Sequence, residues 1–362
     1  MARPRSILGL VFHLATLHVE RRPGACVVML ALVVALGAAL WPRHAARAPI
    51  AGAEGGLQGA VLLDGFAFAQ PAPGGAGHRV VDVDPEGHAR RERTLPATGE
   101  LRVVGTRIGA AAAWQDGKRL RLARVEDDRD MGTWGRSMRQ MCAGVASNAT
   151  RFAVGWLEAD DTVWFVHGPL AAAAEGADEG DGTLAEALSI GAGALTRNDW
   201  CGVASAEDKI ALLWRNADRL SLTMCSQKAC SNLPVSFKLE RGIPVLGVGC
   251  LRAACILATP DDAGTTRITL VTTTGRSKWT HTLDGASGPV SIVGVGDRAF
   301  AVGYATPAGA RVDRFDRDGT ASPVWRDPAS DRPPALAWAS GRLLVAHYHG
   351  ERAVGQTVAL AP

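Results

Sequence analysis

Short apolar runs that open with a basic residue and close on an aromatic one recur along the chain. Clear copies are RFAVGW at 151–156, KIALLW at 209–214, RAFAVGY at 298–304 and RLLVAHY at 342–348, and RIGAAAAW at 107–114 is a looser one. Polar turn sequences such as QDG, EADD and RNAD follow three of these runs. Apolar runs of this length between turn signals are typical of β-strands joined by hairpins. The pattern therefore predicts one strand-and-turn module that is repeated many times.

The residues that close the runs give the period of the repeat. They are Phe68, Trp114, Trp156, Trp214, Tyr304 and Tyr348. Most intervals are 42 to 46 residues, and the 90 residues before Tyr304 hold two periods, with the missing copy at CILAT, 255–259. The interval of 58 residues after Trp156 contains an insert, Ala171–Arg197, that is rich in alanine, glycine and acidic residues. We count seven copies of about 44 residues between Leu57 and Pro362.

Each copy has room for up to four short strands. In the fifth copy these are Val245–Cys250, Cys255–Thr259, Thr266–Thr272 and Lys278–Leu283. Four strands in a period in the low forties are typical of a β-propeller blade, whereas a β-solenoid would show a shorter period. The sequence therefore predicts an all-β domain, a seven-bladed β-propeller, over residues 57–362.

Closure of the ring is less determined by the repeat. The last copy contains only three strands, Ala335–Ala339, Arg342–Tyr348 and Ala353–Leu360. We expect Leu57–Leu63 to complete this blade, which would tie the two ends of the chain together and remove exposed edges. That arrangement shortens the first blade and leaves six blades as an alternative.

An uncharged segment of 17 residues, Ala25–Trp41, follows Arg21 and Arg22. This length is near the lower limit for a helix that crosses a bilayer, and Trp41 at its end is a residue type favoured at the membrane–water interface. We predict a transmembrane signal anchor, with residues 1–24 as a short cytoplasmic N-terminus and 42–56 as a linker. The alternatives are a secretory signal that is cleaved at a small-x-small site, at 37–39 or 51–53, and a buried soluble helix.

The charge distribution bears on the class of partner, and the cysteines bear on the cellular compartment. The net charge of +3 arises within the first 41 residues, and the remainder is balanced, which argues against nucleic-acid binding. Of the seven cysteines, Cys26 lies in the apolar segment and six follow residue 140. Two C-x4-C pairs flank hairpin loops, and two cysteines occupy matching places in neighbouring repeats. We predict the disulfides Cys225–Cys230, Cys250–Cys255 and Cys142–Cys201, with a zinc site as the alternative. Disulfides imply an oxidising, extracytoplasmic location.

One segment carries a family resemblance. Thr274-Gly275-Arg-Ser-Lys-Trp279 has the T-G-x-x-x-W form of the pyrroloquinoline-quinone-type propeller repeat, and Asp316-Arg-Asp318-Gly319 followed by Trp325 is a more distant version. On these residues, the domain resembles bacterial exported β-propellers and is weakly similar to repeat scaffold propellers of that type. The acidic residue that usually precedes the motif is absent. The resemblance implies a blade fold and an envelope scaffold role, and it carries no cofactor site.

Candidate metal ligands are few. His347 and His349 lie on one face of a predicted strand, and the acidic insert contains Asp178, Glu179 and Asp181. We interpret the histidines as surface residues, the insert as a solvated loop, and Asp313, Asp316 and Asp318 as turn residues. Catalytic motifs such as G-x-S-x-G, H-E-x-x-H or a phosphate-binding glycine loop are absent from the sequence. We therefore assign no catalytic, cofactor-binding or metal-binding residue.

Two functions remain open at this point. The first is a membrane-anchored extracytoplasmic scaffold that binds a protein or ligand of the cell envelope, with a partner surface that includes Trp134, Asp178, Glu179, Asp181 and Trp325. The second is an envelope hydrolase or lactonase with a metal site at the propeller axis. Three or more carboxylates or histidines at one mouth of the central channel would distinguish the second from the first.

Overall fold

The computed structural model describes residues 57–62, 65–72, 77–97, 99–106, 109–125, 130–147, 151–169, 186–190, 198–226, 230, 234–239 and 242–360. Within these ranges, no helix has the length and apolar character needed to cross a membrane. The predicted anchor Ala25–Trp41 and its flanking segments, 1–24 and 42–56, lie outside the described residues.

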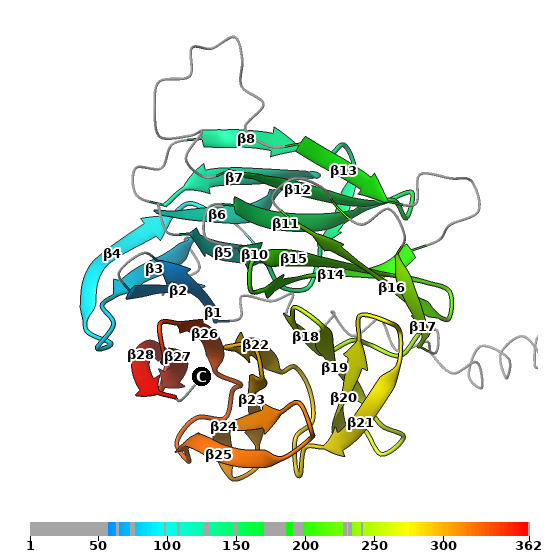
Figure 1. Ribbon diagram of the computed structural model, residues 1–362. Coiled ribbons are helices and arrows are strands. Elements are labelled where there is room, and N and C mark those ends of the chain that lie inside the picture. The colour runs from blue at the N-terminus through cyan, green and yellow to red at the C-terminus, as the bar shows by residue number, and fades with distance from the viewer. Residues whose placement is uncertain are drawn as a thin grey trace, which may run out of the picture. The chain divides into compact units, whose positions relative to one another are not determined.

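The described strands form seven separate antiparallel sheets (Figure 1). The first sheet contains β1 (Gln58–Leu62), β2 (Gly65–Pro71), β3 (His78–Val83) and β4 (Ala89–Leu95). The second contains β5 (Leu101–Thr106), β6 (Gly109–Asp116), β7 (Arg119–Arg124) and β8 (Asp130–Trp134). The third contains β9 (Met138–Met141), β10 (Ala146–Ser147), β11 (Arg151–Glu158), β12 (Val163–Pro169) and β13 (Glu186–Ile190).

The remaining four sheets follow in chain order. The fourth contains β14 (Asn198–Ala206), β15 (Lys209–Asn216), β16 (Arg219–Cys225) and β17 (Val235–Lys238). The fifth contains β18 (Gly247–Leu251), β19 (Ala254–Pro260), β20 (Thr266–Thr272) and β21 (Ser277–Thr282). The sixth contains β22 (Ser291–Val295), β23 (Ala299–Thr306), β24 (Gly309–Asp316) and β25 (Ala321–Asp327). The seventh contains only β26 (Ala335–Ala339), β27 (Arg342–His349) and β28 (Arg352–Ala359).

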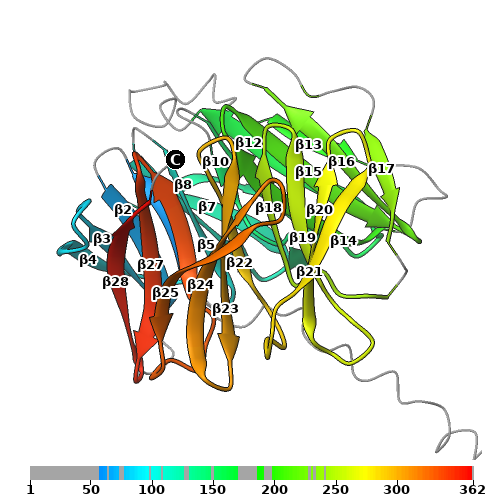
Figure 2. The ribbon, with the colours of Figure 1, turned by 60° about the horizontal axis from the view of Figure 1, so that its bottom comes forward.

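These sheets are the blades of a seven-bladed β-propeller, as the repeat predicts. The first strand of each blade contacts the first strand of the next blade, and β1 contacts β26 and so closes the ring. Figure 1 shows the strands of the first, fifth and sixth blades in order outward from the centre of the ring, and Figure 2 shows the ring turned by 60°. The described core divides into seven apolar clusters, and each cluster joins two neighbouring blades.

The recurring apolar runs are second strands of blades, buried on both faces. In β15, Ile210, Leu212 and Trp214 pack towards the third blade, whereas Ala211 and Leu213 pack towards the fifth. A strand that is buried on both sides carries a continuous apolar run rather than an alternating one. This explains why KIALLW and its copies have no polar positions between the basic residue and the aromatic.

The expected completion of the last blade by Leu57–Leu63 is wrong. Gln58–Leu62 pairs with β2 as the innermost strand of a four-stranded first blade, so the blades number seven and the last keeps three strands. The turn between β3 and β4 covers the outer edge of β28 instead. A Cβ atom added to Gly87 of this turn would lie 3.3 Å from the backbone nitrogen of Thr357. Ring closure therefore depends on side-chain packing and a turn, not on strand pairing.

One buried hydrogen bond, from a backbone amide to a side-chain amide oxygen, links the last blade to the first. Gln70, which is 2% exposed, accepts a 2.6 Å hydrogen bond at Oε1 from the backbone nitrogen of Ala353. We expect Gln70→Leu to lower the free energy of unfolding by about 1–3 kcal/mol, because it leaves a buried N–H without an acceptor. Urea denaturation of the full chain in detergent measures the change, and Gln115→Leu on the half-exposed end of β6 is the control. Equal stability of the two variants would contradict this role.

The predicted insert Ala171–Arg197 is not a single loop. Glu186–Ile190 within it forms β13, which pairs with β12 and supplies the outer strand of the third blade. The repeat count assigns these residues to an insert because the fourth strand of this blade comes much later after the closing aromatic, Trp156, than the fourth strands of other blades do. Removal of the whole insert would therefore remove a strand of the ring.

The three predicted disulfides are present: Cys142–Cys201, Cys225–Cys230 and Cys250–Cys255. Cys250 and Cys255 are directly paired across β18 and β19, as expected for cysteines that flank a hairpin loop. This pairing supports an oxidising, extracytoplasmic environment for the propeller.

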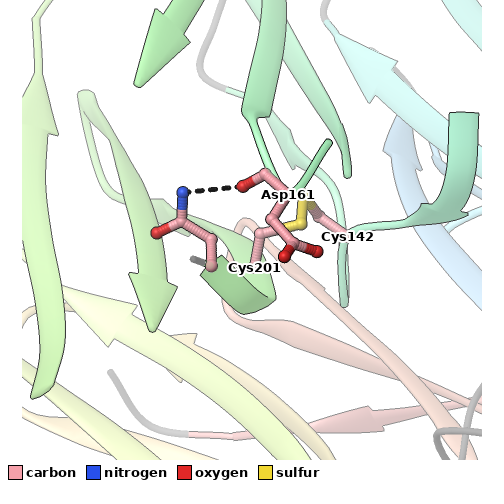
Figure 3. The surroundings of a disulfide bond; sticks show 4 residues. Cys142, Asp161 and Cys201 are labelled. Atoms are coloured by element: carbon pink, nitrogen blue, oxygen red, sulfur yellow. Dashed lines mark hydrogen bonds between the residues drawn. A yellow bond between two sulfur atoms is a disulfide. The ribbon is translucent and has the colours of Figure 1, made fainter. Parts of the chain in front are cut away.

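The disulfide Cys142–Cys201 joins the third blade to the fourth (Figure 3). Cys142 still pairs with β11 through Gly155, but residues 143–145 then oppose a single residue, which makes a bulge in the innermost strand. The bulge reaches the fourth blade, where Ala143 donates to Cys201 at 2.9 Å and accepts from Val203 at 2.8 Å. Nearby, the Asn198 side chain donates to the carbonyl oxygen of Asp161 at 2.9 Å. These two blades are thus linked by covalent and backbone bonds as well as by packing.

The tryptophans of the T-G-x-x-x-W segment and its distant version bridge blades. Trp279 on β21 stacks on Phe315 of the sixth blade and donates from Nε1 to the carbonyl oxygen of Arg317 at 3.1 Å. Trp325 on β25 donates from Nε1 to Gln356 of the seventh blade, also at 3.1 Å. Both residues act in blade packing in this chain.

Candidate functional site: the axial channel

The innermost strands enclose a channel of about 850 Å³ at the axis of the ring. Its wall is rich in glycine because the strands crowd together there. At Gly105 an added Cβ atom would lie 1.8 Å from the carbonyl oxygen of Val61 in the neighbouring blade. At Gly247, in the run GVG, an added Cβ atom would lie 2.4 Å from the carbonyl oxygen of Val290. Glycines at these positions therefore allow the close approach that forms the channel.

The innermost strands run parallel to one another around the axis. Ala143 and Gly202 form a parallel bridge, and the glycines at 247 and 249 lie against Val290 and Ile292 in the same order. All seven strands thus begin at one mouth of the channel and end at the other. Residues at the start of a strand and those after its end lie at opposite mouths.

The mouth where the strands begin contains a buried ion pair. Arg102, the second residue of β5, pairs with Glu100, and their side chains are 7% and 12% exposed. Burial raises the pKa of the Glu100 carboxyl, and the Arg102 charge opposes this shift. The pair therefore places a desolvated guanidinium at the channel wall, with a carboxylate that is easier to protonate than usual.

At the opposite mouth, the described charged residues that line the channel are two carboxylates. Glu207 and Asp208 form the exposed turn after β14, and both line the channel. Trp338 of β26 lines the channel as well and is half-buried. The channel is thus asymmetric, with an arginine at one mouth and two carboxylates at the other.

Among the residues that the structure describes, no group of three or more histidine, cysteine, aspartate or glutamate side chains comes together. The predicted discriminating cluster at the channel mouth is therefore not formed by these residues. Of the two histidines considered as metal ligands, His349 is exposed at the end of β27, in line with its interpretation as a surface residue. His347 is not a surface residue, because it is 9% exposed between the sixth and seventh blades.

His347 is held by two side chains of the sixth blade. Its Nδ1 lies 3.0 Å from Oδ2 of Asp327, and its ring lies 4.8 Å from that of Trp325. Burial lowers the pKa of His347 more than the Asp327 charge raises it. The neutral imidazole is therefore the form that the folded blade interface favours.

This shift predicts a pH-dependent stability. A histidine whose pKa is lowered on folding contributes stability above its unfolded pKa of about 6.5, and that stability is lost as the pH falls below this value. We expect the free energy of unfolding to fall between about pH 7 and pH 5, and His347→Gln to reduce this fall. Urea denaturation across the pH range measures the slope. His349→Gln is the matched control, and equal slopes for both variants would refute the assignment.

The residues of the predicted partner surface are not gathered at one place. Trp134 is half-buried on β8 and packs against the core between the second and third blades. Trp325 belongs to the sixth blade, which is not a neighbour of the second. Asp178, Glu179 and Asp181 lie outside the described residues.

A second, smaller cavity of about 180 Å³ lies between the fifth and sixth blades. At its floor, the Tyr304 hydroxyl donates to Asp313, and Arg311 Nη2 donates to the same carboxylate at 3.2 Å. Burial, together with Asp313, raises the pKa of Tyr304. The interpretation of Asp313 as a turn residue is wrong, because it lies within β24 and is 7% exposed. Its local sequence, RVDRFDRDG, resembles a turn and does not show this burial.

No protein-family model matches this sequence, and no curated protein sequence matches it. Solved structures do match the fold. One, a puromycin hydrolase mutant complexed with PGG, is 14% identical with a TM-score of 0.51, and the match covers 88% of this chain and 54% of that one. Another, from work on two prolyl endopeptidases, is 13% identical with a TM-score of 0.50, over 82% of this chain and 47% of that one.

This chain therefore spans about half the length of these two solved structures. At such low identity the likeness shows a propeller fold alone. The pyrroloquinoline-quinone-type resemblance and bacterial export find no support in these matches.

Proposed function

We propose that this protein is a membrane-anchored scaffold that presents its propeller in the extracytoplasmic part of the cell envelope and binds a protein or ligand there. The extracytoplasmic location is supported by the three disulfides, of which two lie within hairpins and one joins two blades. Such bonds persist in oxidising compartments. The uncharged segment Ala25–Trp41 supports the anchor.

A binding role agrees with the architecture. Seven apolar clusters hold the blades in a rigid ring, and loops on a rigid frame are where recognition residues concentrate. The hydrolytic activities named for the two similar structures belong to proteins about twice as long, so we do not transfer them. We favour binding at the channel mouths and loops over a chemical reaction.

The anchor is tested by membrane extraction. We expect the full chain to stay in the membrane fraction after alkaline carbonate treatment, and the chain without 25–41 to be released. External protease should degrade the propeller in intact spheroplasts if it faces outward. Release of the full chain by carbonate, or protection from external protease, would overturn this part of the proposal.

The partner surface is tested by a deletion that spares β13. Residues 171–185 are replaced by a short glycine-serine turn, so that the outer strand of the third blade remains. We expect the thermal unfolding midpoint to be nearly unchanged and crosslinking to envelope partners to weaken. Shortening of the segment 126–129, which joins β7 to β8 in the second blade, is the control. An unchanged set of crosslinked partners would contradict a role for this segment.

A further inference from the structure

Arg102 is the one basic side chain among the described residues that line the axial channel. Its side chain is only 7% exposed, and Glu100 is its only polar partner in the described part of the chain. The Nε atom is buried without a hydrogen-bond partner there. A buried guanidinium with an unsatisfied Nε–H group is costly to maintain for packing alone. Its place at the wall of a large cavity points to a ligand that supplies acceptor oxygens.

The rest of the wall suits an extended backbone. Each innermost strand is the edge of its blade, so one row of its N–H and C=O groups faces the axis rather than another strand. Backbone bonds between innermost segments of neighbouring blades occur at Ala143 and Val203 and, between the fifth and sixth blades, from Val290 to Leu246. Elsewhere among the described strands this inner row has no partner strand. Exposed strand edges bind extended peptides through main-chain hydrogen bonds.

The charges give such a ligand a direction. Arg102 lies at the mouth where the innermost strands begin, and Glu207 and Asp208 lie at the mouth where they end. A peptide has a carboxylate at one end and an ammonium group at the other. Six residues of β5 span about 17 Å, which is the length of an extended peptide of five or six residues. The cavity volume is also within the usual range for small-ligand sites.

We propose that the axial channel binds the C-terminal end of an extended peptide, whose carboxylate pairs with Arg102 and whose main chain bonds to the inward edges of the innermost strands. The ligand carboxylate takes the place of Glu100 beside the guanidinium. Burial already raises the pKa of Glu100, so this residue can accept a proton when the second carboxylate enters. The proposal deepens the binding role and rests on it, but it concerns the channel and not the segment 171–185, so the two tests can fail separately.

The first test compares ligands on the unaltered full chain in detergent micelles. The probes are tetra-alanine with a free C-terminus, the same peptide with a C-terminal amide, and succinate, each titrated by calorimetry. We expect the free acid to bind at least about tenfold more tightly than the amide, since a charge-assisted bidentate pair is lost. Succinate should bind more weakly than the peptide acid, because it lacks a main chain. Equal binding of acid and amide, equal binding of succinate and peptide, or no binding at millimolar peptide would each overturn the proposal.

The second test uses two variants with opposite expected effects. Arg102→Met should weaken binding of the free acid by at least about tenfold and leave binding of the amide unchanged. Glu100→Gln should tighten binding of the free acid, because it removes the competing carboxylate from the guanidinium. Arg298→Met, at an exposed position, is the matched control. If the ion pair has only a structural role, Arg102→Met and Glu100→Gln should change the affinity for the free acid in the same direction. That result would overturn the proposal.

If Arg102→Met does not fold, Arg102→Lys replaces it, since lysine keeps the charge and loses the bidentate fork. We then expect a weaker but measurable preference for the acid over the amide. Wild-type preference in Arg102→Lys would overturn the assignment of Arg102.

Discussion

Replacement of Cys142 and Cys201 together by alanine is expected to lower the free energy of unfolding by about 4 kcal/mol, the larger of the disulfide effects in this chain. The bond closes a loop between residues 59 apart in sequence, and the entropy that a disulfide removes from the unfolded chain grows with loop length. The same bond holds the 143–145 bulge against the fourth blade, so its loss should also loosen the interface between these two blades. Urea denaturation of the full chain in detergent measures the change.

The hairpin disulfide Cys250–Cys255 is the matched control for this effect. Its cysteines are only five residues apart, so the same relation predicts a loss of about 2 kcal/mol for their double alanine replacement. Hydrogen exchange should rise around Ala143 and Val203 in the first variant and not in the second. A hairpin variant that is as unstable as the inter-blade one would contradict the loop-length argument.

Trp156→Ala is expected to cost about 4 to 5 kcal/mol of stability. The side chain is 1% exposed in the core between the second and third blades, and large-to-small replacements of such residues leave a cavity. Its Nε1 also donates at 2.8 Å to Glu158, a buried carboxylate that accepts from the backbone nitrogens of Arg136 and Ser137. The variant therefore removes both packing and one bond of a buried carboxylate.

Two further variants separate these contributions. Trp156→Phe keeps most of the volume and loses the Nε1 donor, so we expect a smaller loss of about 1 to 3 kcal/mol. Trp164→Ala removes the half-buried ring that stacks on Trp156 at 6.2 Å, and it should cost less than Trp156→Ala. Urea denaturation followed by far-UV circular dichroism, which does not depend on tryptophan fluorescence, measures the stability of these variants. Equal losses of stability for Trp156→Ala and Trp164→Ala would contradict the assignment of the large effect to burial at position 156.

The sequence pattern indicates the fold of this protein more fully than the environments of its buried charged residues. Arg102 is one arginine in the apolar run LRVV, and nothing in that run shows that Glu100 pairs with it or that Arg102 lines the axial channel. His347 reads as a strand-end histidine, yet Asp327 and Trp325 of the preceding blade cover it. Asp313 reads as a turn residue, although Tyr304 and Arg311 surround it within the sixth blade. Asp327 and Trp325 lie one blade away from His347, and Tyr304 lies on the strand next to that of Asp313, so a local run of sequence does not show these neighbours. Glu100 is close to Arg102 in sequence, but only the closed ring buries the pair.

The sequence alone determined the module and predicted seven copies, with six blades as the alternative, because burial on both faces of a strand and the turns that follow it are local properties that leave a local pattern. It also predicted the three disulfides, with a zinc site as the alternative, since two pairs flank hairpin loops and the third occupies matching places in adjacent repeats. Tertiary structure alone decided how the ring closes, with Gln70 bonded to Ala353 across 283 residues and the Gly87 turn against β28. It also decided that Glu186–Ile190 is a strand of the ring and which charges meet at the axis. Contacts such as that between Gln70 and Ala353 join residues that are distant in the chain. A periodic sequence pattern shows which residues are buried, but it does not show which residues they pack against.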